Sequence, residues 1–144
     1  MATKNDFTEQ EWDDLHRGVT GAGMLVSVSD RSFTDSFKES SAMAKALVAA
    51  RTASPSELVR EIASRKGTGF GVVASPTEVS SGSIAALTAS VATLGAKAPD
   101  ELDAYRTFVI GVAEAVAAGA AGGDASEAAA IARIKESLGV PATD

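Results

Sequence analysis

Repeated helix-start motifs constrain the fold of this 144-residue chain more than any other sequence feature. In a capping box, a Ser, Thr or Asp side chain accepts a hydrogen bond from a backbone N–H in the first helical turn. A Glu three residues later bonds back to the backbone of the capping residue. Four stretches fit this pattern: Thr8–Glu11, Ser54–Glu57, Ser75–Glu78 and Asp124–Glu127. A weaker start lies at Ala98–Glu101, where Pro99 suits the first helical position. These motifs predict where five helices begin.

Apolar residues recur at steps of three and four after these starts, which is the spacing of amphipathic helices. The stripes run from Trp12 to Val26, from Leu102 to Val116 and from Ile131 to Leu138. We therefore expect an all-α fold, a single compact bundle of about six helices in one domain that spans residues 1–144. The expected helices cover residues 9–29, 35–51, 55–66, 76–94, 99–119 and 125–138, with weakly similar helical hairpins at the two ends.

The composition excludes several classes of function. The chain has no Cys, one His and a formal net charge of -6. It therefore lacks the residues for disulfide scaffolds, zinc ribbons, thiol nucleophiles and His-rich metal sites. Nucleic-acid binding depends on basic clusters, which an acidic chain of this kind does not offer. We expect no enzyme activity and no cofactor, with His16 at a boundary or on the surface. The sequence has no recognisable signal peptide or membrane span, so we expect a cytoplasmic protein.

Acidic residues gather at two expected helix turns. One turn carries Asp30, Asp35 and Glu39, and the other carries Asp124 and Glu127. Helix capping and solvent-exposed turns explain these carboxylates. The alternative is a site for Ca²⁺ or Mg²⁺, because several oxygen ligands would converge if the two hairpins packed side by side.

Residues 67–96 form a stretch whose only charged residue is Glu78. One interpretation is a central helix that the other helices bury, because a helix that is apolar nearly all round is usually central. The other is an interface with a partner or a second copy, because low-charge apolar surface marks contact sites. The interface residues would be Val79, Ile84, Leu87, Val91 and Leu94. A further hypothesis is a small apolar ligand held near Phe33, Phe37 and Phe70.

The C-terminal hairpin resembles the TerB-like family, an all-helical domain first described in tellurite resistance. The stretch Ala113–Gly119 leads into Gly122-Gly123-Asp124-Ala125-Ser126-Glu127 and ends at Leu138-Gly139, and Ser27–Asp30 with Thr34 and Glu39 forms an N-terminal counterpart. The chain is also similar to a group of uncharacterised bacterial proteins that share Phe7-Thr8, Glu11-Trp12 and Ala22-Gly23-Met24. The resemblance implies a helical fold, acidic cation sites and a link to metal stress. We expect a non-enzymatic protein that acts through a protein partner or as a homo-oligomer, in a stress-response or envelope-associated assembly.

Overall fold

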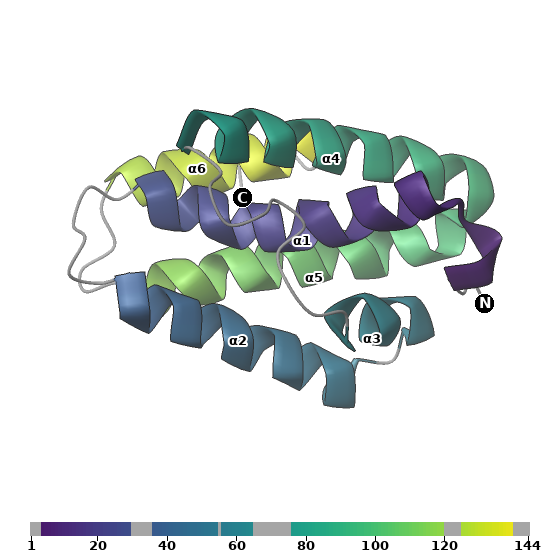
Figure 1. Ribbon diagram of the computed structural model, residues 1–144, viewed down its shortest axis with the longest axis horizontal. Coiled ribbons are helices and arrows are strands. Elements are labelled where there is room, and N and C mark those ends of the chain that lie inside the picture. The colour runs from purple at the N-terminus through teal and green to yellow at the C-terminus, as the bar shows by residue number, and fades with distance from the viewer. Residues whose placement is uncertain (1–3, 30–35, 55, 65–75, 120–124, 140–144) are drawn as a thin grey trace.

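The structure, a computed structural model, describes residues 4–29, 36–54, 56–64, 76–119 and 125–139. A short 3₁₀ turn, Lys4–Asp6, precedes six α-helices in the described residues (Figure 1). These are α1 (Glu9–Ser29), α2 (Ser36–Ala53), α3 (Glu57–Ser64), α4 (Pro76–Lys97), α5 (Pro99–Gly119) and α6 (Ala125–Ser137). No strand occurs within the described ranges, so the predicted all-α bundle is confirmed. None of the described helices is long and apolar enough to cross a membrane.

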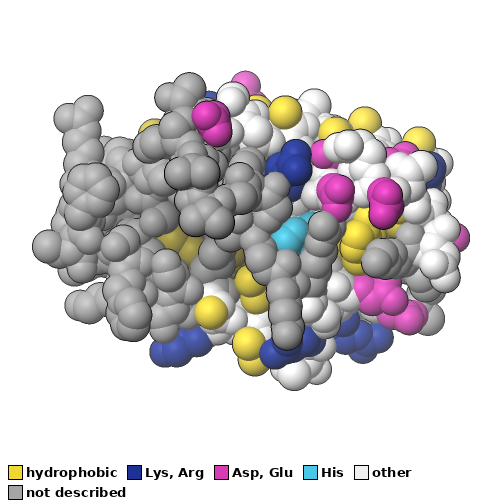
Figure 2. All heavy atoms as spheres, in the orientation of Figure 1, with side chains coloured by type: hydrophobic (Ala, Val, Ile, Leu, Met, Phe, Trp, Pro, Cys, Tyr) yellow, Lys and Arg dark blue, Asp and Glu magenta, His cyan; other side chains and the backbone are white. Residues whose placement is uncertain are grey.

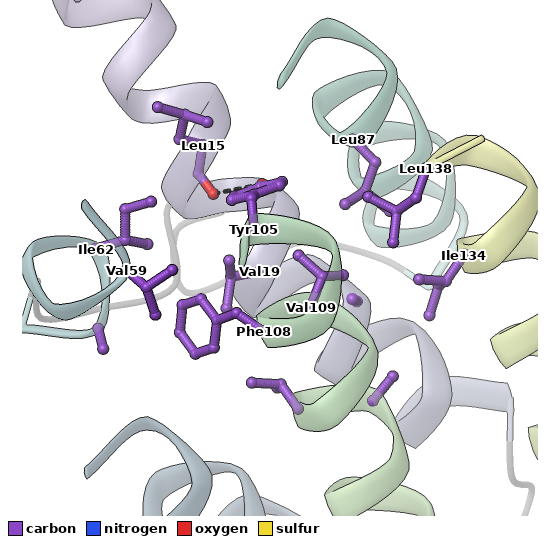
Figure 3. Close-up of a cluster of buried hydrophobic side chains, with 14 of the residues drawn as sticks. Leu15, Val19, Val59, Ile62, Leu87, Tyr105, Phe108, Val109, Ile134 and Leu138 are labelled. Carbon is purple, nitrogen blue, oxygen red and sulfur yellow. Dashed lines mark hydrogen bonds between the residues drawn. The ribbon is translucent and has the colours of Figure 1, made fainter. Parts of the chain in front are cut away.

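Helices α1 and α5 form the middle of the bundle, with α4 and α6 on one side and α2 and α3 on the other (Figure 1). Helix α1 is the most enclosed. From Leu15 to Val26 every residue is buried except Arg17 and Met24, which are half-buried. The three predicted apolar stripes supply about half of the core, and α3 and α4 add residues such as Ile62 and Leu87; part of the core is drawn in Figure 3. The enclosure of α1 explains why its sequence contains so many small residues, because these let neighbouring helices approach closely.

The start of α1 matches its predicted capping box. The N–H of Thr8 donates to Oε1 of Glu11 at 2.9 Å, and the N–H of Glu11 donates to Oγ1 of Thr8 at 3.1 Å. Phe7 and Trp12 pack beside this turn, with ring centroids 6.3 Å apart. Lys97, at the end of α4, ties the same turn to the bundle, because its Nζ lies 2.5 Å from Oε1 of Glu11.

The start of α3 differs from the prediction. Ser56, not Ser54, is the capping residue: its Oγ accepts from the N–H of Val59 at 3.2 Å, and the helix begins at Glu57. The same hydroxyl donates to Oε2 of Glu101 at 2.6 Å. This contact with the first turn of α5 favours capping by Ser56. The sequence alone does not reveal the contact. Ser54 instead accepts from the N–H of Ser56 at 3.2 Å.

Helix α6 ends as its sequence predicts. Gly139 has a φ of 75°, the left-handed conformation that favours glycine after a helix. Nε of Arg106 on α5 donates to the carbonyl oxygen of Leu138 at 2.7 Å, which satisfies one of the last acceptors of the helix. Helix α4 is longer than predicted, because it continues to Lys97 and leaves only Ala98 between itself and α5.

The expected pairing of helices into hairpins is only partly correct. Helix α2 packs mainly against α5 and α3 and has few contacts with α1, although the two follow each other in the sequence. The main partner of α1 is α4. Gly18 explains part of this preference, because its bare Cα lies against Leu87 on α4 and leaves no room for a side chain.

Candidate functional site

The structure does not describe the side chains of the residues predicted to bind a cation. Asp30, Asp35 and Asp124 lie outside the described residues, and the side chains of Glu39 and Glu127 are likewise not described. The part of the chain that the structure describes contains no group of three or more His, Asp or Glu residues placed to hold a metal ion. The helix ends around the two turns do lie together: α1 and α5 end at the same end of the bundle at which α2 and α6 begin (Figure 1). Phe33 and Phe70 also lie outside the described residues, as does the side chain of Phe37.

The residues of the predicted α4 interface lie mostly in the core. Leu87 and Leu94 have no exposed surface, and Ile84 and Val91 are half-buried against the core. The side chain of Val79 is not described. Helix α4 is not buried all round either, because its outer side presents small uncharged residues: Ser81, Ala85, Thr88, Ala92, Gly95 and Ala96. The low charge of this segment therefore reflects core packing on one side and a surface of small residues on the other.

His16 lies in the interior, whereas the sequence indicated a boundary or surface position. It is only 2% exposed, and its backbone carbonyl accepts a hydrogen bond from Oγ1 of Thr20 at 3.1 Å. The expectation is wrong because α4, α5 and α6 cover α1 from several sides, so that positions beside the main apolar stripe are buried as well.

A groove lies between the first turns of α1 and the exposed side of α3, and we call it the acidic groove. Its volume is about 640 Å³. It is lined by Glu9, Trp12 and Asp13 from α1 and by Glu57, Arg60, Glu61 and Ser64 from α3. Among the described residues, four carboxylates and one guanidinium group therefore line this groove. Figure 2 shows acidic side chains gathered around hydrophobic surface in the region of these two helices.

Local structure positions the charged groups of the acidic groove. Glu9 lies in the first turn of α1 and Glu57 in the first turn of α3, where the positive end of the helix dipole favours negative charge. Asp13 and Glu61 follow one helical turn later and extend the same faces. Arg60 reaches across the start of α3, where its Nη1 donates to the carbonyl oxygen of Ser54 at 3.4 Å.

Trp12 gives the acidic groove an apolar component. Trp12 is 5% exposed and packs against Phe7, so that only a small part of the residue borders the groove. The carboxylates attract cations, and the small exposed part of Trp12 offers contact to the apolar stem of a long basic side chain. The groove offers recognition of a positively charged, amphipathic ligand.

The sequence alone does not indicate the acidic groove. Acidic residues cluster near the start of the chain, but their neighbours in the groove, Glu57 and Glu61, are more than 40 positions away along the chain. The available signal was the sequence of α3, which repeats acidic residues beside the buried positions Leu58 and Ile62. Comparisons with protein-family models, with curated proteins and with solved structures found no match for this chain.

Proposed function

We propose that this protein is a non-enzymatic interaction module that docks a basic segment of a partner protein in the acidic groove. The single observation that supports this most strongly is the charge of the described part of the groove lining, in which Glu9, Asp13, Glu57 and Glu61 outnumber Arg60. A surface of one dominant sign steers ligands of the opposite sign and suppresses partners of the same sign.

The groove also fits the size and mixed chemistry of a peptide anchor. Its volume of about 640 Å³ accommodates a few side chains of a partner. Long basic side chains bury apolar stems while their charged ends stay near carboxylates, and Trp12 supplies an aromatic edge for such a stem. We therefore propose that the partner segment contains Lys or Arg residues interspersed with apolar residues.

Binding of a labelled synthetic peptide tests this proposal. The probe is a helical peptide of Lys, Arg and Leu, and a peptide with Glu in place of the basic residues is its counterpart. The basic peptide should bind and the acidic peptide should not, and binding should weaken as the salt concentration rises. Trp12 is the only Trp in the sequence, so its fluorescence should change on binding.

Two pairs of substitutions separate groove binding from general attraction to an acidic protein. Asp13→Asn with Glu61→Gln removes two charges from the groove and should weaken binding about tenfold. Glu114→Gln with Glu136→Gln removes the same charge from exposed positions outside the groove and should leave binding unchanged. Equal weakening by the two pairs would overturn the proposal.

A second candidate function is cation binding at the two acidic turns. It is favoured by one observation, that the described helix ends flanking both turns lie at the same end of the bundle (Figure 1). The ligands would be Asp30, Asp35, Glu39, Asp124 and Glu127. Saturating Ca²⁺ or Mg²⁺ should then raise the unfolding temperature, because an ion that binds only the folded state stabilises it. An unchanged unfolding temperature would exclude this function.

We also propose membership of the TerB-like family, and with it a role in a stress-response or envelope-associated assembly. Its support is the resemblance of the C-terminal hairpin, which ends at Leu138-Gly139 with the glycine in the left-handed conformation. Growth of a deletion strain in its native host under tellurite stress tests this role, and growth equal to that of the parent would contradict it.

A further inference from the structure

A second groove lies on the other side of α3, between α2, α3 and α5, and we call it the apolar groove. Its volume is about 540 Å³. Its walls and floor are mainly small and apolar: Ala49, Ala50, Ala53, Val59, Ala104 and Phe108. Small side chains on both α2 and α5 allow another helix to approach closely. Among the described residues of the lining, the only charged one is Asp103, whose side chain is 95% exposed and lies 3.4 Å from Nη1 of Arg106.

The outer face of α2 carries an exposed apolar residue between two basic residues. Among the described residues, Val48 is the only large hydrophobic residue that is exposed, with 48% of its surface accessible. Lys45 and Arg51 lie three positions before and after it and are both exposed. Steps of three keep these residues on one side of a helix, so α2 presents a basic–apolar–basic face.

From this complementarity we infer that the apolar groove binds the outer face of α2 from a second copy of this chain. Val48 of the second copy would enter the groove, where the alanine walls leave room for it. Lys45 and Arg51 of the second copy would lie near Asp103 and near Asp100, which is exposed one turn earlier on α5.

A second copy fits better than an unrelated partner because this chain itself carries the complementary face. The basic face of α2 offsets acidic residues of α5, which lowers the repulsion expected between two molecules of net charge -6. Helix α2 also supplies one wall of the apolar groove, so a two-fold pair can use the same surface of both copies. Such reciprocal use closes the assembly at a dimer.

Sedimentation equilibrium of the full chain, from micromolar to millimolar concentration, tests this inference. The wild type should be a reversible dimer. Val48→Glu should raise the dissociation constant about tenfold or more, because it places a charge in an apolar contact. Thr88→Glu adds the same charge to the exposed side of α4 and should leave the dissociation constant unchanged. Circular dichroism of each variant confirms that the helices are intact.

A charge exchange tests the orientation of the two copies. Arg51→Glu and Asp103→Arg should each weaken the dimer, because each places like charges in contact. The double variant should recover much of the lost affinity, because both pairs are then restored with opposite sign. A wild type that stays monomeric at millimolar concentration would overturn the inference, as would a Val48→Glu variant that dimerises like the wild type. Absence of recovery in the double variant would overturn the assigned orientation.

Discussion

A Cβ atom at position 18 would lie only 2.5 Å from Oη of Tyr105, so the packing of α5 against α1 depends on the missing side chain of Gly18. Tyr105 is fully buried, and its hydroxyl donates to the carbonyl oxygen of Leu15 at 2.8 Å (Figure 3). The same Cβ atom would lie 3.1 Å from Cδ2 of Leu87 on α4. Gly18 therefore sets how closely α4 and α5 both approach the central helix.

Gly18→Ala should destabilise the protein, although Ala is the better helix former. Overpacking of a core costs roughly 1–3 kcal/mol, while the gain in helix propensity is only about 1 kcal/mol. Urea unfolding of the variant measures the net loss. Gly111→Ala is the matched control, because a Cβ there meets nothing within 4 Å, and it should stabilise the protein. A Gly18→Ala variant as stable as Gly111→Ala would contradict the packing described above.

The stability of the protein should fall in alkaline solution because of the buried hydroxyl of Tyr105. Burial raises the pKa of its hydroxyl well above the ordinary value of 10.0. The folded state therefore keeps a proton that the unfolded state releases. The stabilisation is complete below pH 10 and declines as the pH rises above that value.

Ultraviolet absorbance of tyrosinate measures this directly, because Tyr105 is the only Tyr in the sequence. The absorbance of the folded protein should stay flat through pH 10 and rise only as the helical circular dichroism is lost. Tyr105→Phe supplies the baseline and should cost about 1 kcal/mol through the lost hydrogen bond. Ionisation near pH 10 in a fully helical protein would contradict the burial of this hydroxyl.

The stabilising contribution of Glu11 should be lost in acid. The Lys97 ammonium that bonds its carboxylate, together with the N–H of Thr8, holds the pKa of Glu11 below the ordinary value of 4.5. Its contribution is present above pH 4.5 and is lost as the pH falls through the lowered pKa. Thermal unfolding of the wild type and of Glu11→Gln should therefore differ near neutral pH and converge in acid. A difference of the same size at about pH 6 and about pH 3 would contradict this role.

Local signals predicted the helices because their causes are local. The capping box at Thr8 and Glu11 and the left-handed Gly139 depend on hydrogen bonds and backbone conformations within a few residues. The predicted cap of α3 is at the wrong serine, because a distant residue, Glu101, accepts a hydrogen bond from Ser56. A bond between residues 45 positions apart has no signature in either segment alone.

The sequence did not show which helix is central. Residues 67–96 suggested that α4 was the buried helix, because they carry a single charge. Helix α1 is instead the most enclosed, although its first turns are strongly acidic. Charge at one end of a helix says little about burial at the other, and Ser, Ala and Thr on the outer side of α4 are uncharged without being buried. The sequence did not predict the acidic groove either, because the groove forms only when α3 packs beside α1.

Backbone chemical-shift mapping by nuclear magnetic resonance tests whether a basic segment docks in the acidic groove. The basic peptide is titrated into the isotopically labelled chain, and the shifts of each amide are followed. We expect changes concentrated at residues 9–13 of α1 and 57–64 of α3, with saturation at a single affinity. Shifts spread evenly over exposed acids elsewhere, such as Asp100, Glu114 and Glu136, would show only general charge attraction and would contradict it.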